Sequence, residues 1–402
     1  MRNFPINFVI DTDLPQVKKF KTVTGYAIDC PFCGKQKKFD VNLSKNFARC
    51  NVCGNGDDVN KGFNSLTLHA KLCKATNKEA YADLWNRYKN LPAKLKAQVD
   101  KPIIQVAPQL KTVPLWIRDK IYRTFLEQLS LSKEHEDSLI KRGLSKQRIK
   151  ELNIKDVPVQ EIDCSDIFNK LFNSEPKITQ YFKKHSNAGV AGFYNLHTNP
   201  KCVARQSGIL IPIIVKNPLK DKGYSADLVE ENLISGFQIR YDKVTDKKYT
   251  YWTSAEQDTG CGFSGCESIH FAIPDSVFDT DTMTFVSPEL NCVALTEGCL
   301  KADVASYLSN DYPFIAVLGV SNQRFLSSAL ELLKRKYNTK KIVLVFDADY
   351  ENNEHVAKAM DSAVAKIAEA GLEIDISRWT DLYHKHNIKG IDDLLLYQKY
   401  HK

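Results

Sequence analysis

Several features that would assign a chain to a special class are missing from this sequence. It has no run of eighteen apolar residues, so no membrane-spanning helix is expected. The first residues, MRNFPINFVIDTDLPQ, lack the basic and then apolar segments of a secretory signal peptide. Internal repeats and low-complexity tracts are absent as well. With 43% hydrophobic and 26% charged residues, the composition predicts a packed globular protein in the cytoplasm with no membrane partner.

A disulfide framework is not expected either. The chain has eleven cysteines, an odd number, and its 402 residues are enough to form a core without cross-links. A reducing compartment, with a subset of the cysteines bound to a metal, fits this cysteine content better.

Acidic residues are scarce only in the N-terminal quarter. Residues 1–98 contain 17 Lys and Arg against 8 Asp and Glu, a net charge of +9, whereas residues 288–402 contain 14 against 16, a net charge of −2. The local excess of positive charge suggests a polyanion as the partner of the N-terminal quarter. A solvated basic surface without a partner would have the same composition.

The length of the chain is typical of two or three domains. We expect an N-terminal domain at 1–98, a linker at 99–114, a mixed α+β region at 115–287 and a C-terminal domain at 288–402. The segment KPIIQVAPQLKTVP, residues 101–114, contains three prolines, which favour extended and poorly packed chain.

The C-terminal domain has the clearest pattern. The apolar runs CVALTE, FIAVLG, KIVLVFD and EIDIS have the length of strands, and helical stretches lie between them at 301–309, 324–337 and 355–370. Strands that are buried on both faces are apolar throughout. The alternation therefore predicts a Rossmann-like fold with a parallel sheet.

Four cysteines in the N-terminal domain have the spacing of a zinc ribbon. Cys30 and Cys33 form one C-x-x-C pair, Cys50 and Cys53 form another, and sixteen residues separate the pairs. Two residues between paired cysteines let both sulfurs reach one tetrahedral ion, and sixteen residues suffice for a hairpin. We expect one structural Zn²⁺ at these four residues. Redox-active pairs are the weaker alternative.

The hairpin between the pairs, KQKKFDVNLSKNFARC, combines basic and aromatic residues. Lys37 and Lys38 could contact phosphates, and Phe39 and Phe47 could stack on unpaired bases. Single-stranded nucleic acid is thus an expected partner. The alternative is that both rings pack the small core of the ribbon. His69 and Cys73, at helical spacing nearby, are expected in the core rather than on a metal.

Acidic residues follow the strands of the predicted parallel sheet. Glu297 comes directly after CVALT, Asp347 and Asp349 come directly after KIVLVF, and Asp392 lies in KGIDDLLL before a final helix. Ligands of such sheets bind at the carboxyl ends of the strands. Carboxylates gathered there repel one another unless a divalent cation such as Mg²⁺ lies between them.

Each of these segments also has a structural interpretation. Glu-Gly after a strand is common, an Asp-x-Asp can form an Asx-turn, and Asp392 can cap the last helix. The occurrence of all three in one α/β segment favours a metal site for phosphoryl chemistry.

These residues carry a family resemblance. Glu297-Gly298, Asp347-Ala348-Asp349 and Asp392 resemble the motifs of the toprim domain of DnaG-type primases, type IA and II topoisomerases and some nucleases. TEGCLKADVAS is similar to the toprim variant of primase-like proteins from phages, plasmids and mobile elements, in which a lysine at the position of Lys301 accompanies the glutamate.

The middle region resembles primases in particular. LIKRGLSKQRIKELNI is similar to the helical segment that opens the polymerase domain of bacterial primases, and RQSGILIPI, ISGFQIRY and KKYTYWTS follow the order of that family's strands. The resemblance covers most of residues 25–402. It implies an α/β multidomain fold in which 115–287 is the basic subdomain of the polymerase core and 288–402 is the toprim domain.

The resemblance also implies roles for single residues. Two or more Mg²⁺ or Mn²⁺ ions would be bound by Glu297, Asp347, Asp349 and Asp392. Template or nucleotide phosphates would be contacted by Arg205, Arg240, Lys248 and Lys301. The alternative for the basic residues is that they are exposed charges at strand edges or on a helix surface.

Three features depart from the family's pattern. The ribbon has four cysteines where many bacterial members have three and a histidine, a change that zinc tolerates. Asp303 lies six residues after Glu297 rather than one helical turn, so we do not expect it to be a ligand. We also expect no helicase-binding domain or fused helicase after the toprim domain.

The implied function is that of a DNA primase. Such a DNA-directed RNA polymerase synthesises short RNA primers from nucleoside triphosphates on a single-stranded DNA template by metal-dependent nucleotidyl transfer. A separate replicative helicase is an optional further partner. Two alternatives remain at this point, a toprim-type metal-dependent nuclease and a single-stranded-DNA-binding replication initiation factor with a degenerate site.

Overall fold

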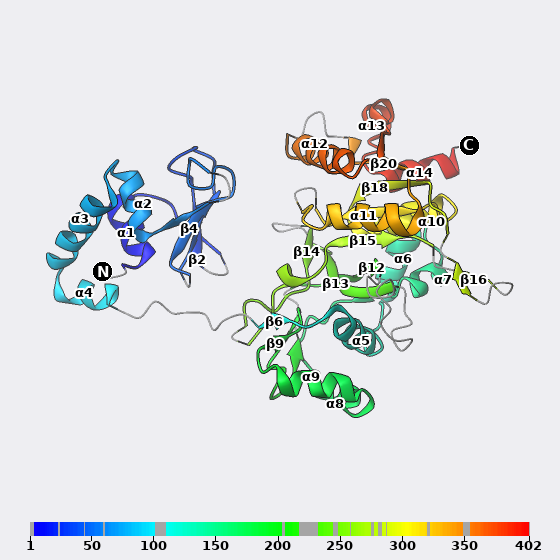
Figure 1. Cartoon of the computed structure of the whole chain (residues 1–402), viewed down its shortest axis with the longest axis horizontal. Coiled ribbons are helices and arrows are strands. Elements are labelled where there is room, and N and C mark those ends of the chain that lie inside the picture. The colour runs from blue at the N-terminus through cyan, green and yellow to red at the C-terminus, as the bar shows by residue number, and fades with distance from the viewer. Residues whose placement is uncertain are drawn as a thin grey trace. The chain divides into compact units, whose positions relative to one another are not determined.

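The chain divides into an N-terminal unit, Met1–Gln109, and a C-terminal unit, Leu110–Lys402 (Figure 1). Each has its own hydrophobic core. The structure is a computed structural model, and it describes residues 4–22, 25–43, 45–58, 61–100, 110–202, 206–216, 232–243, 248–257, 259–274, 277–279, 284–286, 288–319, 322–348 and 354–401.

The N-terminal unit is built on an antiparallel sheet whose strands follow one another in sequence order. The strands are β1 (Phe20–Lys21), β2 (Gly25–Ile28), β3 (Phe39–Asn42), β4 (Phe47–Cys50) and β5 (Phe63–Asn64). Their inward side chains, among them Ile28, Phe39 and Val41, are fully buried. Alternating burial along β3 is what a sheet with one covered face requires.

Four helices accompany this sheet: α1 (Ile6–Asp13), α2 (Ser65–Leu72), α3 (Asn77–Lys89) and α4 (Ala93–Val99). Asn64 and Thr76 begin α2 and α3 with reciprocal hydrogen bonds to the third residue of each helix. Such capping boxes satisfy backbone N–H groups that have no partner within the helix. These two caps fix where the chain leaves the sheet and turns back.

The first half of the C-terminal unit is a mixed α+β region. Its helices are α5 (Leu115–Leu126), α6 (Lys133–Lys141), α7 (Lys146–Glu151), α8 (Ser165–Ser174) and α9 (Pro176–Lys184). A four-stranded antiparallel sheet has the order β14-β13-β12-β7 and comprises β7 (Lys155–Asp156), β12 (Gly208–Lys216), β13 (Asn232–Tyr241) and β14 (Tyr249–Tyr251). Helix α5 covers one face of this sheet through a core that includes Tyr122, Phe125 and Phe237.

Short strands complete this region. One small sheet has the order β10-β11-β8, formed by β8 (Ile162–Asp163), β10 (Phe193–Tyr194) and β11 (Lys201–Cys202). Another pairs β6 (Lys111–Thr112) in parallel with β9 (Ala188–Gly189). Strand β6 comes from the segment expected to be a linker, so residues 111–112 pair within the C-terminal unit. Most of that segment, residues 101–109, lies outside the described residues.

The second half contains a five-stranded sheet of order β15-β19-β18-β20-β21. Its strands are β15 (Ile269–Ala272), β18 (Cys292–Glu297), β19 (Phe314–Val317), β20 (Lys341–Leu344) and β21 (Glu373–Ile376), and a separate hairpin joins β16 (Val277–Asp279) to β17 (Thr284–Val286). Strands β18 to β21 are parallel, whereas β15 is an antiparallel edge strand. The parallel α/β pattern expected from the sequence is therefore present.

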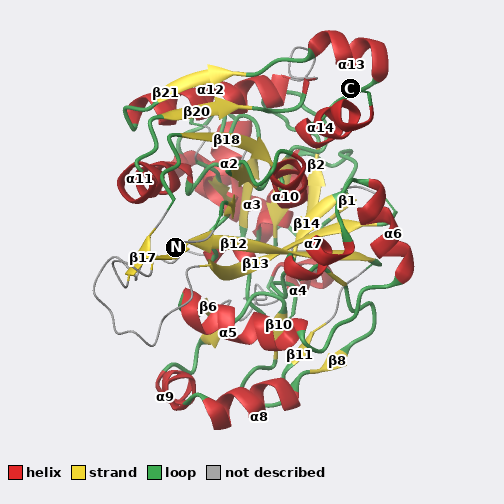
Figure 2. Cartoon of the chain, turned by 90° about the vertical axis from the view of Figure 1, so that its right-hand side faces the viewer, coloured by secondary structure: helices red, strands yellow, loops and turns green. Residues whose placement is uncertain are grey.

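Helices cover both faces of this sheet (Figure 2). They are α10 (Cys299–Leu308), α11 (Leu326–Tyr337), α12 (Glu354–Glu369), α13 (Thr380–His386) and α14 (Ile391–Tyr400). Val293 and Leu295 pack on the side of α11 and α12, whereas Ala294 between them packs with α10 and α14. This alternation explains why the whole strand is apolar.

The two halves of the C-terminal unit share a core and a polar junction. Helices α6 and α7, strands β12 and β13, and helix α10 contribute to one hydrophobic cluster. At the junction the backbone N–H of Ile214 donates to Nδ1 of His270 (3.1 Å), and Nε2 of this buried ring lies 3.0 Å from Asp303. Because Nδ1 accepts a hydrogen bond and therefore carries no proton, Nε2 is the nitrogen that donates to Asp303.

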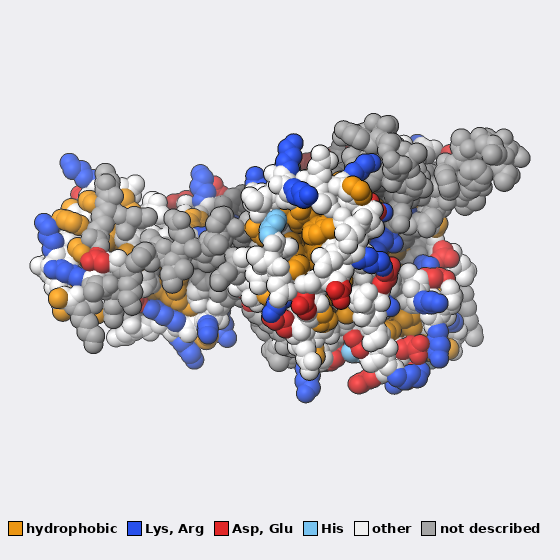
Figure 3. Space-filling view, turned by 90° about the horizontal axis from the view of Figure 1, so that it is seen from below, with side chains coloured by type: hydrophobic (Ala, Val, Ile, Leu, Met, Phe, Trp, Pro, Cys, Tyr) orange, Lys and Arg blue, Asp and Glu red, His pale blue; other side chains and the backbone are white. Residues whose placement is uncertain are grey.

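Charged side chains are distributed differently on the two units. Figure 3 shows acidic and basic side chains interspersed over the described face of the C-terminal unit, whereas basic side chains predominate on the N-terminal unit. Within the described residues, no helix combines the length and the apolar character needed to cross a membrane.

Candidate functional site

The four cysteines of the N-terminal unit converge. The Sγ atoms of Cys30 and Cys53 are 3.6 Å apart, those of Cys33 and Cys50 are 3.7 Å apart, and all four lie within 4.8 Å of one another. Tetrahedral zinc with Zn–S bonds of about 2.3 Å requires sulfurs about 3.8 Å apart. The four thiols therefore fit one zinc ion, as the spacing in the sequence predicts.

Backbone geometry at the two C-x-x-C pairs directs the sulfurs inward. The N–H groups of Phe32 and Val52 donate to the sulfurs of Cys30 and Cys50, at 3.4 and 3.3 Å. Gly34 closes the first turn with a φ of +70°, a conformation that costs glycine little. Burial raises the pKa of the Cys30 thiol, whereas a backbone hydrogen bond from Lys35 lowers that of Cys33 to about 7.

The ribbon hairpin separates its two phenylalanines. Phe39 is fully buried and packs against Phe63, whereas Phe47 is 37% exposed near the tip of the hairpin. Lys37 and Lys38 are exposed, and Nζ of Lys37 lies over the ring of Phe20. Of the two rings, Phe47 alone remains a candidate for stacking on a base.

His69 has a different role from the cysteines of the ribbon. The ring is fully buried, with Nδ1 2.6 Å from Asp13 and Nε2 2.9 Å from Asp83. Arg87 binds both of these carboxylates. The hydrogen bond that His69 donates to Asp13 raises the pKa of His69. A histidine with carboxylates on both nitrogens is a protonated partner of an ion-pair network, and Cys73 lies at its edge, 3.6 Å from Nδ1.

In the C-terminal unit, two acidic side chains meet at the carboxyl edge of the parallel sheet. Glu297 ends β18, and Asp347 lies three residues after β20, the neighbouring strand. Their carboxyl groups interact, because the negative charge of Asp347 raises the pKa of Glu297. Among the residues that the structure describes, no third His, Cys, Asp or Glu ligand atom joins this pair within 4.8 Å.

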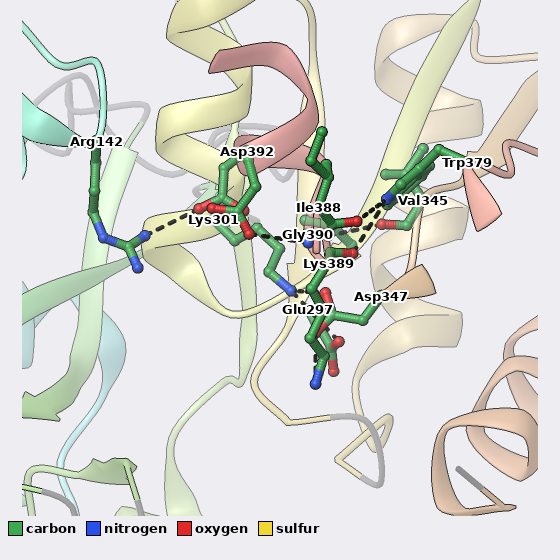
Figure 4. A network of polar contacts seen from close by, with 12 residues as sticks. Arg142, Glu297, Lys301, Val345, Asp347, Trp379, Ile388, Lys389, Gly390 and Asp392 are labelled. Carbon is green, nitrogen blue, oxygen red and sulfur yellow. Dashed lines mark hydrogen bonds and ion pairs between the residues drawn. The ribbon is translucent and has the colours of Figure 1, made fainter. Parts of the chain in front are cut away.

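Lys301 lies between the two acids (Figure 4). Its Nζ is 3.5 Å from Oε1 of Glu297 and contacts Oδ1 of Asp347. Burial raises the pKa of Glu297 to about 7; Lys301 opposes this rise and Asp347 adds to it. Burial is the largest effect on the pKa of Asp347 and raises it. The charge and hydrogen bond of Lys301, together with Glu297 and Lys389, outweigh burial, so this pKa lies below its usual value. The ammonium group of Lys301 thus compensates the negative charge of the acidic pair.

Asp392 is held by a different cation. Its side chain is 6% exposed, and Oδ2 accepts a hydrogen bond of 3.0 Å from Nη1 of Arg142. Arg142 ends helix α6, and the next residue, Gly143, has a φ of +100° and packs directly against Leu308 and Leu396. A side chain at Gly143 would push α6 away from α10 and α14, so this glycine keeps Arg142 within reach of Asp392.

The loop before α14 carries a further cation toward the acids. Nζ of Lys389 is 3.7 Å from Oδ2 of Asp347, and Lys389 O accepts the backbone N–H of Ala348. Nε1 of the buried Trp379 donates to the carbonyl groups of Ile388 and Lys389. Asp393 then caps α14 through the N–H of Gly390. These contacts fix the loop beside the end of β20.

Basic side chains gather on the Asp392 side of the site. Burial and the nearby charges of Arg240 and Arg142 lower the pKa of Lys248, and Asp393 and Asp392 oppose this shift. Arg240 is in β13, and Lys248 immediately precedes the adjacent strand β14. Arg142, Arg240 and Lys248 therefore lie near enough to one another for their like charges to interact.

Two of the predicted site residues, Asp349 and Arg205, lie outside the described residues. Asp303 is on α10, but it is buried against His270 rather than directed at Glu297. This agrees with its exclusion from the expected ligands.

Arg142 and Lys389 are site residues that the sequence did not single out by role. Arg142 lies in the RGLS segment, and Lys389 lies in KGIDD, which also contains Asp392. Both residues therefore belong to segments that the sequence singles out. Their contacts could not be predicted, because only the fold brings Arg142 next to Asp392.

Comparisons with known proteins identify relatives of the C-terminal part and of the fold. A family described as a domain of unknown function, DUF3854, matches residues 285–401. No curated protein matches the chain.

Several solved structures are similar to the chain. The E. coli primase catalytic core is 15% identical, with 72% of this chain and 84% of that chain covered and a TM-score of 0.39. The RNA polymerase domain of Mycobacterium tuberculosis primase DnaG, in complex with double-stranded DNA, is 16% identical, with 71% and 80% covered and a TM-score of 0.41. The primase fragment of the bacteriophage T7 primase-helicase protein is 12% identical, with 93% and 98% covered and a TM-score of 0.30.

At these identities and TM-scores the likenesses decide nothing about function. The chain's own residues define its class: a mixed α/β protein with a four-thiol metal site in one unit and an acidic pair neutralised by lysine in the other.

Proposed function

We propose that the protein is a DNA primase, a nucleotidyltransferase that joins nucleoside triphosphates into a short RNA on a single-stranded DNA template. The observation that carries the proposal is the pair of carboxylates, Glu297 and Asp347, at the carboxyl edge of adjacent parallel strands. Phosphoryl-transfer sites commonly lie at such edges, where side chains from neighbouring strands converge on one ligand.

The acidic pair and its surroundings suit a phosphate-bearing substrate. We assign Glu297, Asp347, Asp349 and Asp392 to hold two or more Mg²⁺ or Mn²⁺ ions. Bound divalent ions would neutralise charge on the reacting phosphates and favour the alkoxide form of the attacking hydroxyl. Arg142, Arg240 and Lys248, together with Arg205, would bind the phosphates of template and nucleotide.

The N-terminal unit suits the template. Zinc bound by the four thiols would hold the hairpin in shape, and the hairpin offers exposed Lys37, Lys38 and Phe47. Lysines bind phosphates of any sequence, and an exposed ring can stack on an unpaired base. We therefore assign single-stranded DNA to this surface.

Primer synthesis from labelled nucleotides on single-stranded DNA, with Mg²⁺ or Mn²⁺, tests the proposal. We expect ladders of RNA from the wild-type chain and at least a hundredfold loss for Glu297→Gln, which keeps the shape of the side chain but removes its charge. Asp375→Asn is the matched control, because Asp375 is exposed on the edge strand β21 and pairs with Lys341. It should retain full activity.

Other products would point to other functions. Shortened DNA in place of RNA would identify a metal-dependent nuclease. Retention of the DNA without any product would identify a binding protein with an inactive site. Either result, or normal synthesis by Glu297→Gln, contradicts the proposal.

A further inference from the structure

Lys301 has an unusual position for a side chain at a metal-binding pair. It lies in the first turn of α10, whereas Glu297 ends β18 just before that helix. Gly298 allows the sharp change from strand to helix with a φ of +82°. The lysine side chain is 18% exposed, so its ammonium group is largely withdrawn from water.

The ammonium group uses the same oxygens that a metal would need. Nζ contacts Oδ1 of Asp347 and lies 3.5 Å from Oε1 of Glu297. A divalent cation bound by both carboxylates would have to take these oxygens, and it would repel a positive charge at that distance. Lysine and metal therefore exclude one another from the space between the acids.

A third carboxylate lies near the lysine. Cε of Lys301 and Oδ1 of Asp392 both pack against Gly390, where a Cβ would lie 3.3 Å and 2.5 Å from them. Burial raises the pKa of Asp392, and the charge of Lys301 opposes this rise. Arg142 binds Oδ2 of Asp392, and Oδ1 is the oxygen beside Gly390.

We propose that Lys301 is an internal cation that competes with the divalent metal for Glu297 and Asp347. Without metal it neutralises the pair; when metal binds, its ammonium group leaves the two carboxylates and turns toward Asp392. The inference rests on the proposed function in one respect, namely that the acidic pair takes a divalent cation.

The alternative is that Lys301 is a fixed ion-pair partner and that metal binds without disturbing it. The two cases differ in what happens when the charge is removed. A competitor lowers metal affinity, so its removal strengthens binding. A fixed partner orders the carboxylates, so its removal leaves metal binding unchanged or weakens it.

Mn²⁺ binding to the full, zinc-loaded chain distinguishes the two cases. We expect the Kd for Mn²⁺, measured by electron paramagnetic resonance of the free ion, to fall at least tenfold in Lys301→Met. Lys341→Met is the matched control, because Lys341 begins β20, at the opposite end of that strand from the acidic pair, and it pairs with the exposed Asp375. Its Kd should stay within threefold of the wild-type value.

A second measurement needs no variant and decides the matter if Lys301→Met does not fold. Reductive methylation of the wild-type chain, mapped by mass spectrometry, reports how accessible each lysine is. We expect methylation of Lys301 to rise severalfold at saturating Mn²⁺, while the exposed Lys399 on α14 is labelled equally with and without the ion.

The outcomes separate this inference from the proposed function. Unchanged or weaker Mn²⁺ binding by Lys301→Met, or a Lys301 that stays protected when Mn²⁺ is bound, overturns the inference. If neither the wild-type protein nor Lys301→Met binds Mn²⁺, both the inference and the proposed metal site are wrong. Tighter binding by Lys301→Met in a chain that makes no primers upholds the inference and contradicts only the proposed function.

Discussion

Replacing Arg142 with methionine would remove the cation that faces the buried carboxylate of Asp392. Loss of one partner from a fully buried ion pair costs about 3–5 kcal/mol, because the other charge stays buried without compensation. Here the Asp392 side chain is 6% exposed and that of Arg142 is 24% exposed, so water screens part of the interaction. We expect the free energy of unfolding of the C-terminal unit to fall by about 2 kcal/mol at neutral pH.

A double-mutant cycle shows whether this loss comes from the pair. Asp392→Asn removes the charge that Arg142 compensates, so the double variant should be more stable than the two single effects predict. We expect a coupling energy of about 1–2 kcal/mol. Burial already raises the pKa of Asp392, and removal of Arg142 should raise it further. The cost of Arg142→Met should therefore shrink at acidic pH, where the carboxyl group is protonated and needs no cation.

Urea unfolding followed by tryptophan emission is a suitable assay. Of the four tryptophans, only Trp85 belongs to the N-terminal unit, so a Trp85→Phe background restricts the signal to the C-terminal unit. A cost below about 0.5 kcal/mol for Arg142→Met, or additivity in the cycle, would refute the reasoning. Either result would mean that Asp392 is adequately solvated without its partner.

Three further perturbations have clear expected outcomes. Cys50→Ser should lower zinc content, measured by atomic absorption, from one ion per chain to nearly none, because the remaining thiols leave the tetrahedral site incomplete. The hydrogen bond that His69 donates to Asp13 raises the pKa of His69. Its stabilising effect is complete below the unfolded value of about 6.5 and is lost as pH rises through the higher folded value, so His69→Gln should reduce the fall in melting temperature of the N-terminal unit as pH rises above about 6.5. Gly192→Ala should cost about 3 kcal/mol or more in urea unfolding, because φ is +91° and the new Cβ would lie 1.5 Å from Nε1 of the buried Trp252.

Features that depend on nearby residues could be predicted from the sequence. The zinc ribbon is such a case, because two residues between paired cysteines restrict where both sulfurs can lie. The parallel sheet is another, since each strand is an apolar run followed by a helix. Glu297 and Asp347 follow from the sheet, because adjacent parallel strands bring their carboxyl ends together.

Features that depend on packing between distant segments could not be predicted. Arg142 and Asp392 are 250 residues apart in the sequence, and they meet because Gly143 packs against α10 and α14. Lys301 was expected to contact phosphate or solvent. Its position between the acids depends on the rotamer it adopts in the folded site, and periodicity carries no information about that choice.

The two candidate metal sites differ in how the chain treats their charge. In the described part of the acidic site, each carboxylate has a cation of the chain beside it: Lys301 for Glu297 and Asp347, and Arg142 for Asp392. That site can fold without metal, since no buried charge is left uncompensated. The four thiols have no such partner, and burial opposes ionisation of Cys30. Only a bound cation would stabilise four thiolates there, so we expect zinc binding at the four cysteines to be coupled to folding. At the acidic pair, by contrast, we expect binding of a divalent cation to be coupled to the displacement of Lys301.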